Sequence, residues 1–149
     1  MIAVAASPEA REAHREVRLI SADGGREGQV RREGLAEGRR RSARTAAAIE
    51  AAAASLIGPN DTVLNLASGV YGKGFGYWSA RYHKDMVEIE VPFNESIDPA
   101  SVEAAFKQRP DIKIVSLVHH DTPSGTINPI REIGRIVRDH GALLLVDAV

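Results

Sequence analysis

The chain contains no cysteine, which excludes disulfides, cysteine-ligated zinc and thiol nucleophiles. It also lacks a run of about 18 apolar residues, the length that a membrane-spanning helix needs. The N-terminus does not have the basic start and apolar core of a signal peptide. Opposite charges nearly cancel to a formal net charge of -1, so overall charge does not favour nucleic acid or an anionic membrane. These absences predict a cytoplasmic protein that binds neither nucleic acid nor membranes.

Residues 1–44 contain no aromatic residue and no lysine, yet they hold most of the arginines. A segment of mixed charge with few apolar residues cannot bury enough surface to offset the entropy of ordering the chain. We therefore expect this segment to be disordered or loosely helical. Two other interpretations stay open. One is a basic arm for RNA or an acidic partner, centred on the run GRRRSAR, and the other is a stretch read in a shifted frame of a GC-rich gene.

The pattern over residues 45–149 is regular. It predicts helices over 45–58, 77–83, 98–110 and 128–141, strands over 61–68, 86–93, 111–120 and 142–149, and a glycine-rich loop over 69–76. Strands that alternate with amphipathic helices are typical of an α/β fold with a mostly parallel sheet. We expect three layers, with helices covering both faces of this sheet.

Polar residues follow three of the predicted strands. They are the run from Ser68 to Tyr71, the run HHDTPSGT over 119–126, and Asp147. Ligands of open α/β sheets bind at the carboxyl ends of the strands. The three clusters therefore predict one common site.

The segment SGVYGKGFG follows a strand and precedes a predicted helix, so its backbone N–H groups favour an anion, above all a phosphate. Its spacing G-x-x-G-x-G-x-G matches neither G-x-G-x-x-G nor the P-loop. A flexible crossing loop is the alternative interpretation. Lys73 has neither an apolar pocket nor a cationic neighbour in the sequence, so we interpret it as a solvated charge and not a nucleophile.

His119 and His120 are adjacent, so on a strand they point to opposite faces and cannot chelate one ion together. Asp121 completes no metal-binding pattern, and we expect no metal site. Ser124 does not lie in the G-x-S-x-G elbow of hydrolases. The run Thr-Pro-Ser-Gly indicates a tight strand-to-helix turn, before which Thr122 can present its hydroxyl to a ligand.

Asp147 ends the apolar run ALLLV. A carboxylate in that position is costly unless it is paired. A cationic ring nitrogen would stabilise it as a pair, whereas the alternative is a cap on the following loop.

Three blocks, NLASGVYGKGF, HHDTPSGTINPI and GALLLVDAV, occur in the order found in class V PLP-dependent aminotransferases of fold type I. Residues 51–149 resemble that family. The resemblance implies that residues 45–149 are part of a large domain that binds pyridoxal 5′-phosphate (PLP). It assigns the phosphate to Ser68, Gly69 and Val70, ring stacking to Tyr71, the O3′ side of the ring to Thr122, and the ring nitrogen to Asp147.

The family reaction transfers an amino group from an amine such as pyridoxamine or an amino acid to pyruvate or a related 2-oxo acid, in an enzyme that is a homo-oligomer. The Schiff-base lysine of the family follows the VDAV strand, and no residue up to Val149 matches it. The resemblance therefore assigns no catalytic residue, and we expect this chain alone to be inactive. The family carries Gly-Glu-Pro where this chain reads Ala43-Arg44-Thr45, which fits a gene fragment or a frame-disrupted copy.

Two alternative functions remain at this point. A Rossmann-like NAD(P) domain would use the glycine-rich segment for the pyrophosphate and Glu88 or Glu90 for the ribose, although the glycine spacing is wrong for it. A non-catalytic interaction module would instead use the arginine-rich segment as a basic arm.

Overall fold

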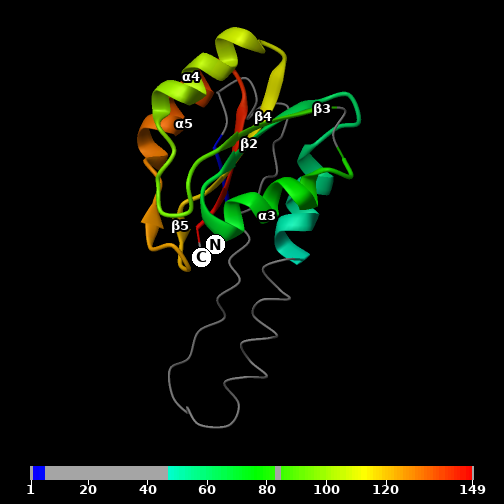
Figure 1. Ribbon diagram of the computed structural model, residues 1–149. Helices are drawn as coiled ribbons and strands as arrows, with labels where there is room; N and C mark the ends of the chain where they lie inside the picture. The colour runs from blue at the N-terminus through cyan, green and yellow to red at the C-terminus, as the bar shows by residue number, and fades with distance from the viewer. Residues whose placement is uncertain (1, 6–46, 83–84, 149) are drawn as a thin grey trace.

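A computed structural model describes residues 2–5, 47–82 and 85–148 of the chain (Figure 1). Residues 47–56 are helical. The other helices and strands are β1 (Ile2–Ala5), β2 (Thr62–Ala67), α3 (Gly69–Ser79), β3 (Asp85–Glu90), α4 (Pro99–Gln108), β4 (Ile112–Val118), β5 (His120–Asp121), β6 (Thr126–Ile127), α5 (Ile130–Asp139) and β7 (Leu143–Asp147).

Five strands form one sheet in the order β1-β7-β4-β2-β3. The strands β3, β2, β4 and β7 are mutually parallel, and only β1 is antiparallel to its neighbour. Helices α4 and α5 cover one face, while α3 and the helix over residues 47–56 cover the other (Figure 1). The prediction of a three-layer α/β fold with a mostly parallel sheet is confirmed.

Alternating side chains of the central strands fill the core on both faces of the sheet. Towards α4 and α5 the core contains Leu64, Leu66, Val115, Leu117, Leu144 and Val146. Towards the helix over residues 47–56 it contains Val63, Ile114 and Leu143. The central strands are therefore buried on both faces, as expected of parallel strands that read as continuous apolar runs.

Strand β1 was not predicted. Residues Ile2–Ala5 pair with β7 at the edge of the sheet, with Ile2 opposite Asp147. For these four residues the structure differs from the expectation of a disordered or frame-shifted segment over 1–44. The physical reason is that Ile2 and Val4 favour a strand and the edge of β7 offers backbone groups for pairing. Residues 1 and 6–44 of that segment lie outside the described residues.

The prediction of a glycine-rich loop over 69–76, followed by a helix from Tyr77, is wrong. The glycines form the first turns of α3, which begins at Gly69. A Cβ at Gly76 would lie 2.5 Å from Nδ2 of Asn65, and one at Gly72 would lie 3.0 Å from the carbonyl oxygen of Leu66. These glycines therefore allow α3 to approach β2 closely, and this packing outweighs their low helix propensity.

The other elements agree with the sequence. Asp98 caps α4 as predicted and accepts a hydrogen bond from the Ala100 amide at 2.9 Å. Helix α5 buries Ile133 and Val137, and Gly141 ends it with a φ of 70°. The run over 122–125 is a tight turn, but it joins the short strands β5 and β6 and does not lead directly into a helix.

Within the described residues, none of the helices combines the length and apolar character required to traverse a lipid bilayer.

Candidate functional site

The three polar clusters predicted from the sequence lie at one edge of the sheet. Strands β2, β4 and β7 are neighbours, and their carboxyl ends meet there, with Val118 paired to Asp147. Strand β3 lies on one side of β2, and the next strand, β4, lies on the other side. The direction in which strands are added to the sheet therefore reverses at β2. Such a switch point is where α/β sheets bind ligands.

Ser68 and Gly69 connect β2 to α3. Ser68 is fully buried, and its hydroxyl donates a hydrogen bond to the carbonyl oxygen of Glu95 at 2.8 Å. Gly69 has a φ of 69°, a backbone conformation that favours glycine. The Ser68 hydroxyl therefore positions the loop between β3 and α4, and it does not cap α3.

Val70 and Tyr71 lie in the first turn of α3, and both side chains are about half exposed, Tyr71 at 54%. The backbone amide of Tyr71 donates a hydrogen bond to Oδ1 of Asp121 at 2.9 Å. The N-terminus of α3 therefore already faces a carboxylate from a distant part of the chain.

Asp121 was missed as a site residue by the sequence reasoning. It is the only charged residue among those described that is fully buried. Its Oδ2 accepts hydrogen bonds from the Ser124 amide at 3.1 Å and from the Ser124 hydroxyl at 2.7 Å. Burial acts to raise the pKa of this carboxyl, but the bonds from Tyr71, Ser124 and Val70 together lower its pKa below the ordinary value.

Thr122 is exposed in the turn that follows Asp121. The turn closes with a hydrogen bond from the Gly125 amide to the carbonyl oxygen of Asp121 at 2.9 Å, and Gly125 has a φ of 70°. Asp121 thus anchors the turn that carries Thr122, next to the start of α3.

Asp147 is the last residue of β7 and is half-buried. Its carbonyl oxygen accepts a hydrogen bond from the His119 amide at 2.8 Å. The structure therefore brings the carboxyl end of β7 directly beside the segment that leads into the Thr122 turn.

His119 is half-buried and His120 is exposed, and the structure indicates no chemical role for either. Within residues 2–5, 47–82 and 85–148, no three His, Asp or Glu side chains come together as ligands of one metal ion.

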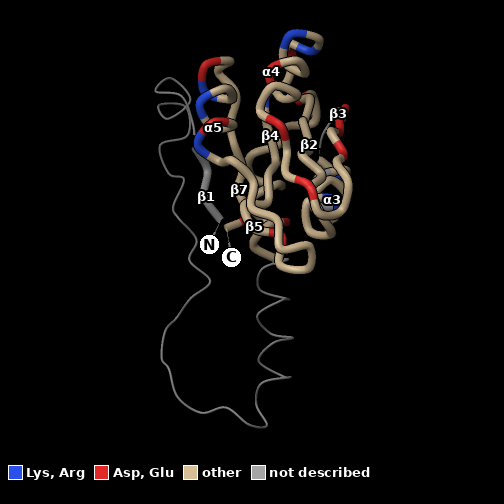
Figure 2. The backbone as a smooth tube through the Cα atoms, turned by 60° about the vertical axis from the view of Figure 1, so that its left-hand side comes forward, with Lys and Arg blue, Asp and Glu red and all other residues tan. Residues whose placement is uncertain are grey.

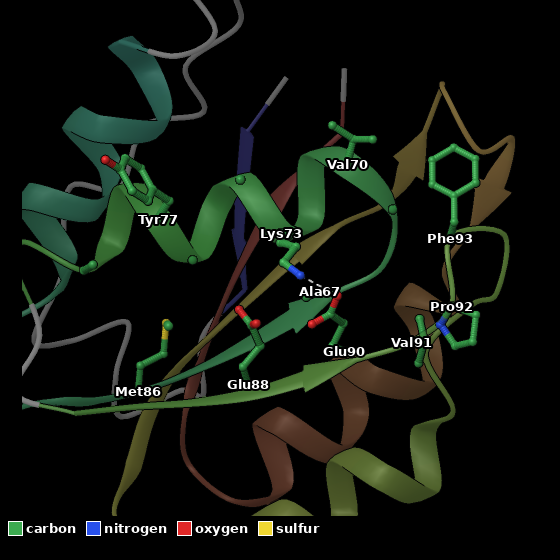
Figure 3. Close-up of a pocket in the computed structure, with 14 residues that line it drawn as sticks. Ala67, Val70, Lys73, Tyr77, Met86, Glu88, Glu90, Val91, Pro92 and Phe93 are labelled. Atoms are coloured by element: carbon green, nitrogen blue, oxygen red, sulfur yellow. Dashed lines mark hydrogen bonds and ion pairs between the residues drawn. The ribbon is translucent and has the colours of Figure 1, made fainter.

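A groove of about 720 Å³ lies between α3 and β3 and reaches the start of α3 (Figure 3). Lys73 crosses it to donate a hydrogen bond to Glu90 at 2.6 Å, and this bond raises the pKa of Lys73. Glu88 accepts a hydrogen bond from the buried Asn65 at 2.8 Å. Both glutamates are therefore engaged by neighbouring side chains.

Comparison with known proteins gives a family match over most of the chain. Residues 42–149 match the family model for class-V aminotransferases. A pyridoxamine–pyruvate transaminase of Mesorhizobium japonicum is 66% identical over 101 residues, covering 68% of this chain and 26% of that protein. A 2-aminoethylphosphonate–pyruvate transaminase of Bacteroides fragilis is 32% identical over 101 residues, covering 68% of this chain and 28% of its own length.

Solved structures agree with the sequence comparison. The crystal structure of pyridoxamine–pyruvate aminotransferase from Mesorhizobium loti superimposes with a TM-score of 0.69 at 64% identity, over 70% of this chain and 27% of that one. The chain thus spans about a quarter of the length of the relatives that it matches.

Proposed function

Because its match over residues 42–149 places this chain in the class-V aminotransferase family, we propose that residues 45–149 form the PLP-binding part of an aminotransferase large domain. Class-V aminotransferases depend on PLP. The observation that carries the proposal is the convergence of the α3 N-terminus, the Thr122 turn and Asp147 at the switch point of the sheet.

The start of α3 fits a phosphate group. The helix begins directly after a strand, and Gly69 has a left-handed conformation in which no larger side chain fits, since a Cβ there would lie 2.2 Å from the Asp121 carboxyl. Ser68, Gly69 and Val70 would hold the phosphate in this cradle. The Tyr71 and Val70 amides donate to Asp121 in this structure. Ser68 donates through its amide to Leu66 and through its hydroxyl to Glu95. A bound phosphate would therefore take the place of some of these acceptors.

The other assigned residues fit the ring of the cofactor. The half-exposed ring of Tyr71 offers a stacking surface, and the exposed Thr122 hydroxyl is available to the O3′ side. Asp147 supplies a carboxylate that would keep the ring nitrogen protonated through an ion pair. When bound, PLP supplies the electron sink for amino-group transfer.

The substrates that we propose are an amine, such as pyridoxamine or an amino acid, and pyruvate or a related 2-oxo acid. Two similar proteins are named as transaminases that use pyruvate, but their amine donors differ. The comparison therefore supports pyruvate as the acceptor more strongly than it supports any one donor. The charge and composition of the chain support neither nucleic acid nor a membrane as a partner.

We also propose that the 149 residues alone do not catalyse turnover, because no lysine among the described residues suits the role of the nucleophile. Lys73 is protonated and paired with Glu90, which makes its amine a poor nucleophile. Lys107 lies in the last turn of α4 and Lys113 near the amino end of β4, away from the site edge. Lys84 lies outside the described residues.

The nicotinamide alternative has no supporting observation. The alternative would place Glu88 or Glu90 on a ribose, but these side chains are engaged by Asn65 and Lys73, and β3 is an edge strand of the sheet. The basic arm of the interaction-module alternative lies outside the described residues.

We propose a cytoplasmic homo-oligomer for the whole protein. The groove beside α3 leaves Val70, Tyr77 and Phe93 exposed, and a second chain would have apolar surface to cover there. Light scattering of the purified protein measures this assembly directly.

The proposal is tested by a calorimetric titration of the purified chain with pyridoxamine 5′-phosphate. This form of the cofactor lacks the aldehyde and cannot react with surface lysines, so any heat of binding reports the site. We expect saturable binding, no saturable binding of NADH, and at least about tenfold weaker binding of pyridoxamine, which lacks the phosphate.

Equal affinity for pyridoxamine with and without its phosphate would contradict the phosphate assignment. Saturable binding of NADH in place of the pyridoxamine forms would support the nicotinamide alternative. Production of alanine from pyruvate and an amine by the isolated chain would overturn the proposal that it is inactive.

A further inference from the structure

Asp121 links two segments of the site that are far apart in the sequence. Its Oδ1 accepts from the Tyr71 amide, 50 residues earlier, while its Oδ2 accepts from the amide and hydroxyl of Ser124. One oxygen therefore binds the helix that carries Tyr71, and the other binds the turn that carries Thr122. The side chain is fully buried, so these bonds are shielded from bulk solvent.

The shape of the backbone around Asp121 depends on the same contact. The carboxyl group occupies the space that a side chain at position 69 would need, because a Cβ there would lie 2.2 Å from it. The left-handed Gly69 and the buried carboxylate thus fit each other. Helix α3 approaches the turn only because position 69 has no side chain.

We propose that Asp121 is a positioning residue that holds the Tyr71 and Thr122 segments at a fixed separation, so that both contact the cofactor at once. This inference rests on the proposed function, since it assigns Asp121 a part in cofactor binding without direct contact. A carboxylate beside a phosphate site would by itself repel the ligand. Removing the Asp121 carboxylate should therefore weaken binding if its role is positioning, and strengthen binding if it only competes with the phosphate.

Asparagine cannot replace Asp121 in this arrangement. The carboxylate accepts hydrogen bonds on both oxygens, whereas an amide accepts on one side and donates on the other. In an Asp121→Asn variant, either the Tyr71 amide or the Ser124 amide would face another donor. One of the two segments must therefore move away or lose its bond.

The experiment compares the unsubstituted chain with Asp121→Asn and with the control Glu90→Gln. Glu90 ends β3 at the same edge of the sheet, so the control removes the same charge from an exposed position. Amide hydrogen exchange of Tyr71 and Ser124 is measured first, without ligand. Pyridoxamine 5′-phosphate is then titrated into each variant by calorimetry.

We expect exchange at Tyr71 or Ser124 to accelerate at least about tenfold in Asp121→Asn, together with about tenfold weaker ligand binding, and neither change in Glu90→Gln. Faster exchange with unchanged affinity would show that Asp121 stabilises the fold only. Tighter binding by Asp121→Asn would show that the carboxylate competes with the phosphate. Both results would overturn the proposal.

Two further outcomes also decide the proposal. If Asp121→Asn does not fold, exchange in the unsubstituted chain is followed at rising urea below the unfolding transition. A shared carboxylate predicts that the Tyr71 and Ser124 amides lose protection together, and independent loss would contradict the link. If the unsubstituted chain binds no pyridoxamine 5′-phosphate, the proposed function fails together with the cofactor part of this inference, while the exchange data still decide whether the link exists.

Discussion

At the carboxyl ends of the strands the charge of Asp121 is fully buried and held by backbone amides. At the amino ends, Arg109 is partly exposed and forms ion pairs with both Asp85 and Asp111. Arg109 donates to Asp85 at 2.8 Å and to Asp111 at 2.9 Å. In Figure 2 the backbone tube is coloured for charged residues at the end of α4 and along α5.

This contrast supports our proposal that the carboxyl-terminal edge binds the cofactor and the amino-terminal edge contributes to stability. Charges that pair with each other leave little capacity for a ligand, so we assign the amino-terminal edge to stability. The opposite edge arranges backbone N–H groups and strand-end carboxylates around a buried anchor. Its polar groups determine the geometry of a site, and we expect their loss to cost more than the loss of an exposed ion pair.

The largest expected effect comes from Gly69→Ala. An alanine there must adopt a left-handed conformation and place its Cβ against the Asp121 carboxyl. We expect a loss of at least about 2 kcal/mol in the free energy of unfolding, measured by urea denaturation. Gly74→Ala is the control, because a Cβ at Gly74 meets nothing within 4 Å. Equal stability of the two variants would contradict the close fit at position 69.

The next effect concerns Asn128, which is buried beside the site edge. It accepts from the Ile97 amide at 2.9 Å and donates to the carbonyl oxygen of Val118 at 2.8 Å. Asn128→Ala leaves both groups unsatisfied, so we expect a loss of about 2 kcal/mol in urea denaturation. Asn94→Ala, at an exposed asparagine, should stay within about 0.5 kcal/mol of the unsubstituted chain.

Arg109→Ala is expected to destabilise the chain less than Asn128→Ala, because its ion pairs are exposed to solvent and salt. The loss should shrink further when urea denaturation is repeated at about 1 M salt, where charges are screened beyond about 3 Å. Arg135→Ala on α5 serves as the control for removing one exposed arginine. A loss that does not depend on salt would contradict an electrostatic origin.

The smallest expected effect is the pH dependence of the stability that is lost in Arg109→Ala. Hydrogen bonds from Arg109 lower the pKa of both Asp85 and Asp111 in the folded chain. Their contribution is therefore present above the unfolded aspartate pKa of about 3.9 and is lost as pH falls through the folded values. The difference in stability between the unsubstituted chain and Arg109→Ala should disappear in acid. A difference that stays constant down to a pH of about 2 would be inconsistent with this origin.

The sequence predicted the fold well because hydrophobic periodicity is local information. The runs that became β2, β4 and β7, and the capped helix α4, could be placed from their patterns alone. The glycine-rich segment was misassigned, since its helical state depends on contacts with Asn65 and Leu66 of another element. Strand β1 was missed for the same reason, because its partner is a strand at the far end of the chain.

The candidate site was partly predictable. Ser68, Tyr71, Thr122 and Asp147 could be grouped because the ends of parallel strands meet at one edge. Asp121 could not be identified, because its link to Tyr71 is a tertiary contact. A signal existed in the run Asp-Thr-Pro-Ser-Gly, where an aspartate commonly accepts from the backbone of its own turn. That pattern predicts the bond to Ser124 but not the bond to α3.

The most direct test of the difference between the two edges is a calorimetric titration of pyridoxamine 5′-phosphate into three proteins: the unsubstituted chain, Asp147→Asn and Arg109→Ala. We predict the same affinity for the unsubstituted chain and Arg109→Ala, and at least about tenfold weaker binding by Asp147→Asn, because only Asp147 would face the ring nitrogen. Equal affinity in all three proteins, or weakened binding by Arg109→Ala alone, would contradict the assignment of the cofactor to the carboxyl-terminal edge.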